Sequence, residues 1–192
     1  MHILIVDKAN ETKRVADFGP THVAVFQTTP EDTGEVEGVP AENSFCTKIN
    51  KQNEASLATM GPLIDFIRQV PADARLLFRC DAGVSRSATG ALLALCIHMP
   101  DVPVEEHFGL LRAHWPHVVP QRGMLRMTDD ILGLKGKLVL ASQADTAERM
   151  LSLPVINISP DGAPRIVTLP SRKPKSWRRV FKSFLLRLAY KL

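Results

Sequence analysis

The chain has 192 residues, of which 45% are hydrophobic and 23% charged, as is ordinary for one globular domain with a short appendage. Three widely spaced cysteines, Cys46, Cys80 and Cys96, exclude a disulfide framework and a zinc-binding pattern, and they favour a reducing compartment. The N-terminal apolar run is too short for a signal peptide, and no run is long enough to cross a bilayer. We therefore expect a cytoplasmic protein.

The net charge of +4 is unevenly distributed along the chain. Residues 172–192 hold eight Lys or Arg residues and no acid, which leaves a charge of −4 for residues 1–171. The basic pI therefore belongs to the C-terminal tail, and nothing in the charge pattern indicates a nucleic-acid partner.

The predicted elements alternate between strands and helices along the chain. Strands rich in β-branched or other apolar residues are predicted at 2–7, 22–28, 44–49 and 74–80. Helices are predicted at 54–70, 87–99, 104–113, 123–134 and 138–151. Pro62 either kinks the first of these helices or begins its second half, and the polar segment 31–43 reads as a loop. The alternation predicts an α/β fold, with a mostly parallel sheet of four or five strands flanked by helices.

The C-terminal part changes character and divides the predicted α/β domain, residues 1–151, from two appended segments. Residues 152–174 contain five prolines and are predicted to be a linker or an edge hairpin. Residues 175–192 place apolar and basic side chains on opposite faces of a helix. Such a helix could bind an anionic membrane surface, which would make the protein peripheral to a membrane, or it could dock on the acidic domain or a partner.

Residues 79–90, with the sequence RCDAGVSRSATG, predict a loop between an apolar strand and an apolar helix. Backbone N–H groups of such a loop and of the first helical turn converge on one point and bind a tetrahedral dianion. The predicted phosphate-binding residues are Asp81, Ala82, Gly83, Val84, Ser85 and Arg86.

The same loop predicts a sulfur nucleophile at its base. A helix N-terminus and a nearby cation lower a thiol pKa, so Cys80 is expected to be a thiolate that attacks phosphorus. Arg86, six residues later, can grip two phosphate oxygens in a bidentate fork. Ser87 can donate a hydrogen bond to the sulfur and make it a better leaving group.

The stretch CDAGVSRSATG resembles the signature loop of cysteine-dependent protein tyrosine phosphatases, especially the dual-specificity branch and related small bacterial and phage enzymes. Residues 111–136 are similar to the segment that follows this loop in predicted bacterial tyrosine phosphatases. The resemblance covers residues 1–140 and implies a phosphatase-like fold without a metal or other cofactor. It implies that Cys80, Arg86 and Ser87 hydrolyse phosphotyrosine in proteins through a cysteinyl-phosphate, with phosphoserine and phosphothreonine as further candidates.

Three positions depart from the family pattern. Arg79 stands where the family has His, and Gln121 follows Pro120 where the family has Asn. The family's general acid is an Asp about 30 residues before the cysteine, and here Glu54 is the nearest carboxylate, with Asp81 as a second candidate. These departures favour one alternative, a weak or inactive phosphatase-like module that binds phosphorylated partners. The tail at 175–192 leaves a second alternative open, a membrane-associated phospholipid phosphatase.

The other two cysteines and one acidic pair lie outside the predicted loop. Cys46 could form a redox disulfide with Cys80 if the third strand adjoins the loop. Cys96, on the apolar helix, is predicted to be inert, and Asp129 with Asp130 to form a solvated helix face.

Overall fold

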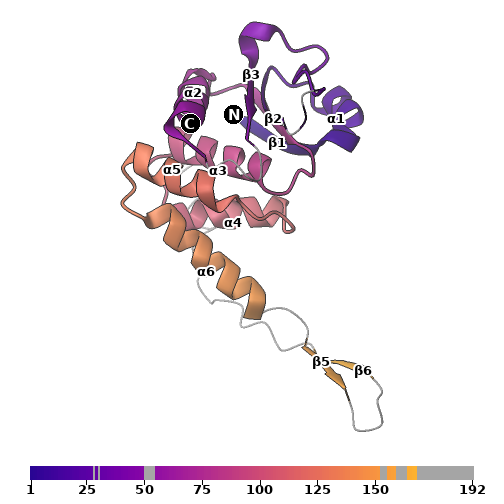
Figure 1. Cartoon of the computed structure of the whole chain (residues 1–192), viewed down its shortest axis with the longest axis vertical. Helices are drawn as coiled ribbons and strands as arrows, with labels where there is room; N and C mark the ends of the chain where they lie inside the picture. The colour runs from indigo at the N-terminus through magenta and orange to yellow at the C-terminus, as the bar shows by residue number, and fades with distance from the viewer. Residues whose placement is uncertain (28, 30, 50–54, 152–154, 159–163, 168–192) are drawn as a thin grey trace, which may run out of the picture. The chain divides into compact units, whose positions relative to one another are not determined.

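The structure is a computed structural model that describes residues 1–27, 29, 31–49, 55–151, 155–158 and 164–167 (Figure 1). The chain divides into two compact units, Met1–Ala144 and Asp145–Leu192. The helix predicted at residues 175–192 lies outside the described residues, so its contact with a membrane or a partner stays a prediction. None of the helices in the described ranges is long and apolar enough to cross a bilayer.

Four parallel strands form the central sheet of the first unit. In chain order they are β1 (His2–Asp7), β2 (His22–Gln27), β3 (Ser44–Lys48) and β4 (Arg75–Cys80). Their spatial order is β1-β4-β2-β3, and every pairing is parallel. This confirms the α/β prediction and the mostly parallel sheet. Because the strands are parallel, their carboxyl ends meet at one edge, where Cys80 ends β4.

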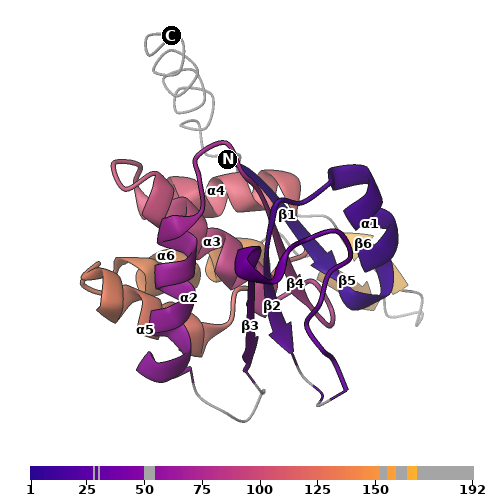
Figure 2. The ribbon, with the colours of Figure 1, turned by 90° about the horizontal axis from the view of Figure 1, so that it is seen from above.

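Helices cover both faces of this sheet, as the apolar pattern of its strands requires. The helices of the described residues are α1 (Glu11–Phe18), α2 (Leu57–Gln69), α3 (Arg86–His98), α4 (Val104–His114), α5 (Arg122–Leu132) and α6 (Lys137–Leu151), of which α4 packs on α3. Figure 2 shows α1 on one side of the sheet and α2, α3 and α5 on the other. Phe78 and Cys80 face the core beneath α2 and α3, whereas Leu77 belongs to the core on the α1 side.

Local sequence explains where the central helices begin and how they pack. The Ser56 and Thr59 side chains form a capping box that begins α2, and the helix continues through Pro62. On α3, a Cβ added to Gly90 would lie 2.5 Å from the Phe78 ring, so the missing side chain lets this helix approach β4 closely. The two helices thereby enclose the apolar face from which Cys80 emerges.

The second unit contains a small antiparallel pair, β5 (Val155–Ile158) and β6 (Pro164–Val167). A hairpin was one of the two alternatives for the proline-rich segment 152–174. The rest of that segment lies outside the described residues.

Candidate active site

The predicted phosphate loop joins β4 to α3. Cys80 is the last residue of β4 and is 2% exposed, Ser85 is the N-cap of α3, and Arg86 is the first helical residue. Gly83 adopts a φ of +63°, and a Cβ there would lie 2.9 Å from the backbone N of Asp7. Only glycine fits this left-handed turn against β1, so Gly83 fixes how tightly the loop bends.

Hydrogen-bond donors surround the Cys80 sulfur. The Ser87 Oγ lies 3.1 Å from Sγ, and the backbone N–H groups of Ser87 and Gly83 also point to it. Burial opposes ionisation of the thiol. The Ser87 hydroxyl, these N–H groups and the positive charge of Arg86 outweigh burial and hold the pKa of Cys80 below its ordinary value. The loop and the first turn of α3 therefore form a bowl of donors around the sulfur, and anion binding in this bowl stays a prediction.

This environment predicts that Cys80 reacts with iodoacetamide at lower pH than the exposed Cys46. Burial and the charge of Asp32 raise the pKa of Cys46, whereas the pKa of Cys80 is lowered. Mass spectrometry of both peptides after alkylation between pH 5 and pH 9 would give the two profiles. Orthovanadate should protect Cys80 and leave Cys46 reactive. A Cys80 profile at or above that of Cys46 would contradict the bowl.

Arg86 is buried at the edge of the bowl, with its guanidinium anchored to the ends of two strands. Its Nη1 donates to the carbonyl oxygens of Phe26, Gln27 and Ile49 at 3.3, 3.1 and 3.0 Å. Its Nη2 lies 3.4 Å from Asp81 Oδ2 on the loop itself. The ends of the two strands thus hold one side of the Arg86 guanidinium in place. The positive charge of this guanidinium favours ionisation of the Cys80 thiol.

Arg79, the residue before the nucleophile, has a network of its own on the opposite face of the sheet. Its side chain is 2% exposed and donates from Nη1 and Nη2 to both carboxylate oxygens of Asp32 at 2.8 and 2.9 Å. Its Nε lies 2.9 Å from Glu11 Oε1, as an ion contact rather than an aligned hydrogen bond. Lys8 Nζ lies 3.6 Å from Asp32 Oδ2. Arg79 therefore ties α1 and the loop around Asp32 to β4.

Gln121 connects the start of α5 to Thr89 of α3, which contacts the phosphate loop. Its backbone N–H donates to Thr89 Oγ1 at 2.7 Å, and the Thr89 hydroxyl donates to the carbonyl oxygen of Ser85 at 2.9 Å. Its Oε1 accepts from Met124 N–H at 2.5 Å and caps α5. The Val119 N–H also donates to the Val84 carbonyl at 2.9 Å. The segment therefore holds Val84 and Ser85 in place.

The general acid has two candidates from the sequence, Glu54 and Asp81. Glu54 lies outside the described residues, so its role stays a prediction. Asp81 is an exposed loop residue whose Oδ2 lies 3.4 Å from Arg86 Nη2. The described part of the chain contains no group of three or more His, Cys, Asp or Glu side chains that could hold a metal ion.

A polar pocket of about 420 Å³ adjoins the phosphate loop. Ala82 and Gly83 form one wall, and the basic side chains Lys13, Arg14 and His117 also line it. The loop itself contains no Lys or Arg beyond Arg86, and α1 brings Lys13 and Arg14 to its border. Positive charge at this border favours the approach of an anionic substrate.

Two of the smaller predictions are wrong, for reasons of topology and capping. Cys46 pairs in register with Val25, which also pairs with Arg79, so Cys46 shares the Arg79 face of the sheet. Cys80 lies on the opposite face and β2 separates the two strands, which excludes a Cys46–Cys80 disulfide. Of the pair predicted to be solvated, Asp130 is exposed, but Asp129 is buried and accepts from the N–H groups of Gly136, Leu138 and Val139.

Comparisons with known proteins place this fold. No family model matches the sequence, and no curated protein matches it. Among solved structures, the Cydia pomonella PTP-2 phosphatase aligns with a TM-score of 0.53 at 15% identity, over 88% of this chain and 95% of its own. DUSP15 aligns with a TM-score of 0.52 at 15% identity, over 73% of this chain and 88% of its own. Tk-PTP in its active form aligns with a TM-score of 0.50 at 16% identity, over 67% of this chain and 88% of its own. The chain has the fold of the cysteine-dependent protein tyrosine phosphatases.

Proposed function

We propose that this chain is a cysteine-dependent phosphatase that hydrolyses phosphotyrosine in proteins, with Cys80 as the nucleophile. The observation that carries the proposal is the sulfur at the carboxyl end of β4, which accepts from Ser87 Oγ and from the backbone N–H groups of Gly83 and Ser87, beside Arg86. A thiolate within converging N–H groups attracts a phosphate dianion and stands in line to attack it. Fold similarity supports the proposal and does not by itself assign an activity.

The reaction would run in two displacements at phosphorus. In the first, Cys80 Sγ forms a bond to phosphorus, the phosphorus–oxygen bond of the ester breaks, and the leaving oxygen takes up a proton. In the second, water attacks phosphorus, the sulfur–phosphorus bond breaks and inorganic phosphate is released. Ser87 donates to the departing thiolate, while Arg86 and the loop N–H groups stabilise the charge on the transferring phosphoryl group.

Without the family's Asp as general acid, the hydrolysis rate depends more strongly on how readily the leaving group departs unprotonated. A tyrosine phenol has a pKa near 10 and leaves more readily without a proton than an aliphatic alcohol does. General acid catalysis contributes about 10²- to 10⁴-fold, so its absence would restrict the enzyme mainly to aryl esters. Glu54 remains our candidate for this acid, because it is the nearest carboxylate in the segment that holds the family's acid.

Two peptides of one sequence, one carrying phosphotyrosine and the other phosphoserine, would test this assignment by phosphate release. We expect phosphotyrosine to be hydrolysed faster, and Glu54→Gln to lower its rate by about 10²-fold. Glu42→Gln, an exposed carboxylate near β3, is the matched control and should leave the rate unchanged. An unchanged rate in Glu54→Gln would remove Glu54 from the mechanism, and phosphate release from neither peptide would refute the phosphotyrosine phosphatase.

A second candidate function is capture of phosphorylated partners without turnover. The absence of the family's general-acid Asp favours it, because a loop that holds a phosphate group can bind a phosphorylated partner without protonating its leaving group. In that case the phosphotyrosine peptide would bind and stay intact. For either function we propose a cytoplasmic location, with residues 175–192 as the candidate contact to an anionic membrane surface.

A further inference from the structure

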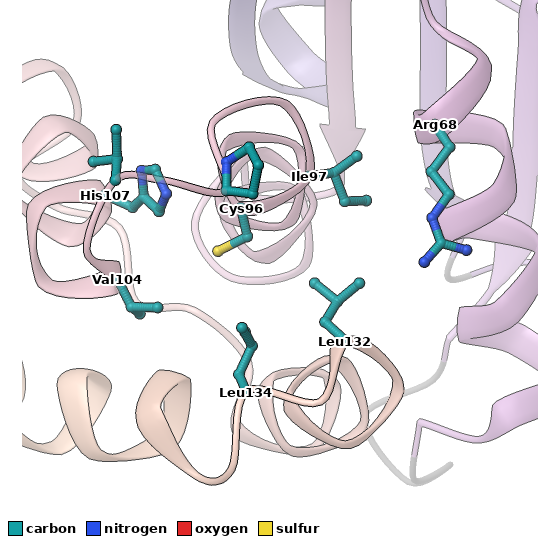
Figure 3. Close-up of a pocket in the computed structure, with 9 residues that line it drawn as sticks. Arg68, Cys96, Ile97, Val104, His107, Leu132 and Leu134 are labelled. Carbon is teal, nitrogen blue, oxygen red and sulfur yellow. The ribbon is translucent and has the colours of Figure 1, made fainter.

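A second pocket lies at the far end of α3 from the phosphate loop. Its volume is about 220 Å³, and its wall is mainly aliphatic, with Val104, Leu132 and Leu134 among the lining residues. Cys96 and His107 complete this part of the wall, and Figure 3 shows their side chains around the central space. The helix α3 begins at Arg86, and this pocket adjoins its last turns, so the two sites share one helix.

His107 is the feature of this pocket that lacks an explanation in the fold. Its side chain is 1% exposed, and its Nδ1 has no hydrogen-bond partner within the described residues. A hydrogen bond to the backbone of Met99 occupies the ring's one N–H, while burial lowers the pKa of the imidazole and keeps it neutral. Nδ1 therefore carries a buried lone pair that needs a hydrogen-bond donor. Leaving that hydrogen bond unmade costs free energy.

The rest of the wall defines what can supply that donor. The aliphatic side chains favour a compact apolar body, and the volume exceeds the ~150 Å³ of an engineered cavity that binds benzene. Burial and Asp129 raise the pKa of Cys96 to about 12, so the thiol beside it carries no charge and does not attack a ligand. Arg68 lines the pocket across from His107 and pairs with Asp65 at 3.3 Å (Figure 3).

We propose that this pocket binds a small, mainly apolar molecule that carries one hydroxyl group, which donates a hydrogen bond to Nδ1 of His107. A single aromatic or short aliphatic ring with a hydroxyl, of the size of phenol, fits the volume and the one acceptor. The site is separate from Cys80, so its occupation does not depend on the phosphatase reaction.

Phenol and anisole, which share one ring and differ in the donor, are the probes for this proposal. Titration of the full chain, followed by its thermal unfolding temperature and by chemical shifts, should show saturable binding of phenol, with anisole at least about tenfold weaker. His107→Phe keeps a ring in the wall and removes the acceptor, so the two probes should then bind equally. His114→Phe, an exposed histidine outside the pocket, should retain the discrimination.

Two further measurements keep the proposal testable if His107→Phe does not fold. The ¹⁵N shift of His107 Nδ1 in the unmodified chain should move when phenol is added and not when anisole is added. Leu134→Trp, which fills the pocket from a half-buried position, should remove phenol binding. Equal affinity for both probes, no saturable binding, or an Nδ1 shift that ignores phenol would show that water alone satisfies His107, and each would overturn the site.

Discussion

Replacing Cys80 with serine is expected to lower kcat for p-nitrophenyl phosphate by about 10⁴-fold or more, because it removes the nucleophile itself. The donors at the bottom of the bowl lower the pKa of the Cys80 thiol and so favour its thiolate form. A serine hydroxyl in the same place would stay protonated near neutral pH, since its pKa is far above that of a thiol. The substitution is nearly isosteric, so the bowl should persist and still bind phosphate or vanadate.

Cys96→Ser is the matched control for this experiment. Both thiols are buried and lie next to or within α3, but only Cys80 is surrounded by donors, and the pKa of Cys96 is raised to about 12. Cys96→Ser should therefore keep full activity per folded molecule, whatever it costs in stability. Equal rates for wild type and Cys80→Ser, measured on protein that binds vanadate, would show that Cys80 is not the nucleophile of a phosphatase.

The parts of the site that sequence reasoning located are those that depend on local backbone geometry. The strand that ends at Cys80 contains the apolar run Leu76–Phe78, and the Gly83 turn and the start of α3 at Arg86 lie within the short stretch that follows. In such a strand–loop–helix unit the positions of the nucleophile, the N–H groups and the guanidinium are coupled by the chain itself. That is why RCDAGVSRSATG alone predicted the strand–loop–helix geometry and the donors around Cys80.

The parts that escaped prediction depend on partners distant in sequence. The helix α1 reads as polar, because only Val15 and Phe18 of its eight residues pack on the core. Nothing in the sequence around Asp129 indicates that three backbone N–H groups of the following segment donate to its carboxylate. Arg79 carried one usable signal, since a charge within a buried strand requires a partner, but nothing identified Asp32, 47 residues away, as that partner.

That Arg79–Asp32 pair is expected to be the largest single electrostatic contribution to stability, and Asp32→Ala should lower the free energy of unfolding by about 3 kcal/mol. Both side chains are buried and joined by two hydrogen bonds. Removal of Asp32 leaves the guanidinium buried with Glu11 as its remaining ion contact. Urea unfolding at pH 7 would measure the loss. Asp65→Ala breaks an exposed pair with Arg68 and should cost at most about 1 kcal/mol.

The same pair predicts how stability changes in acid. Hydrogen bonds from Arg79 hold the pKa of Asp32 below its ordinary value, against the opposing effect of burial. A carboxyl whose pKa is lowered by folding stabilises the native state above its unfolded pKa near 3.9, and that contribution disappears as pH falls through the lower folded value. The difference in unfolding free energy between wild type and Asp32→Ala should therefore shrink below about pH 4.

Replacing both partners separates the cost of a broken pair from the worth of the pair itself. Arg79→Met with Asp32→Leu removes the buried charges together and should recover most of the stability that Asp32→Ala loses, because no unpaired guanidinium remains. If the double variant is as unstable as Asp32→Ala, packing and the loop contacts of Asp32 carry the stability instead. If it is stable yet its Cys80 alkylation profile moves to higher pH, Arg79 positions the end of β4, and with it the sulfur at the base of the bowl.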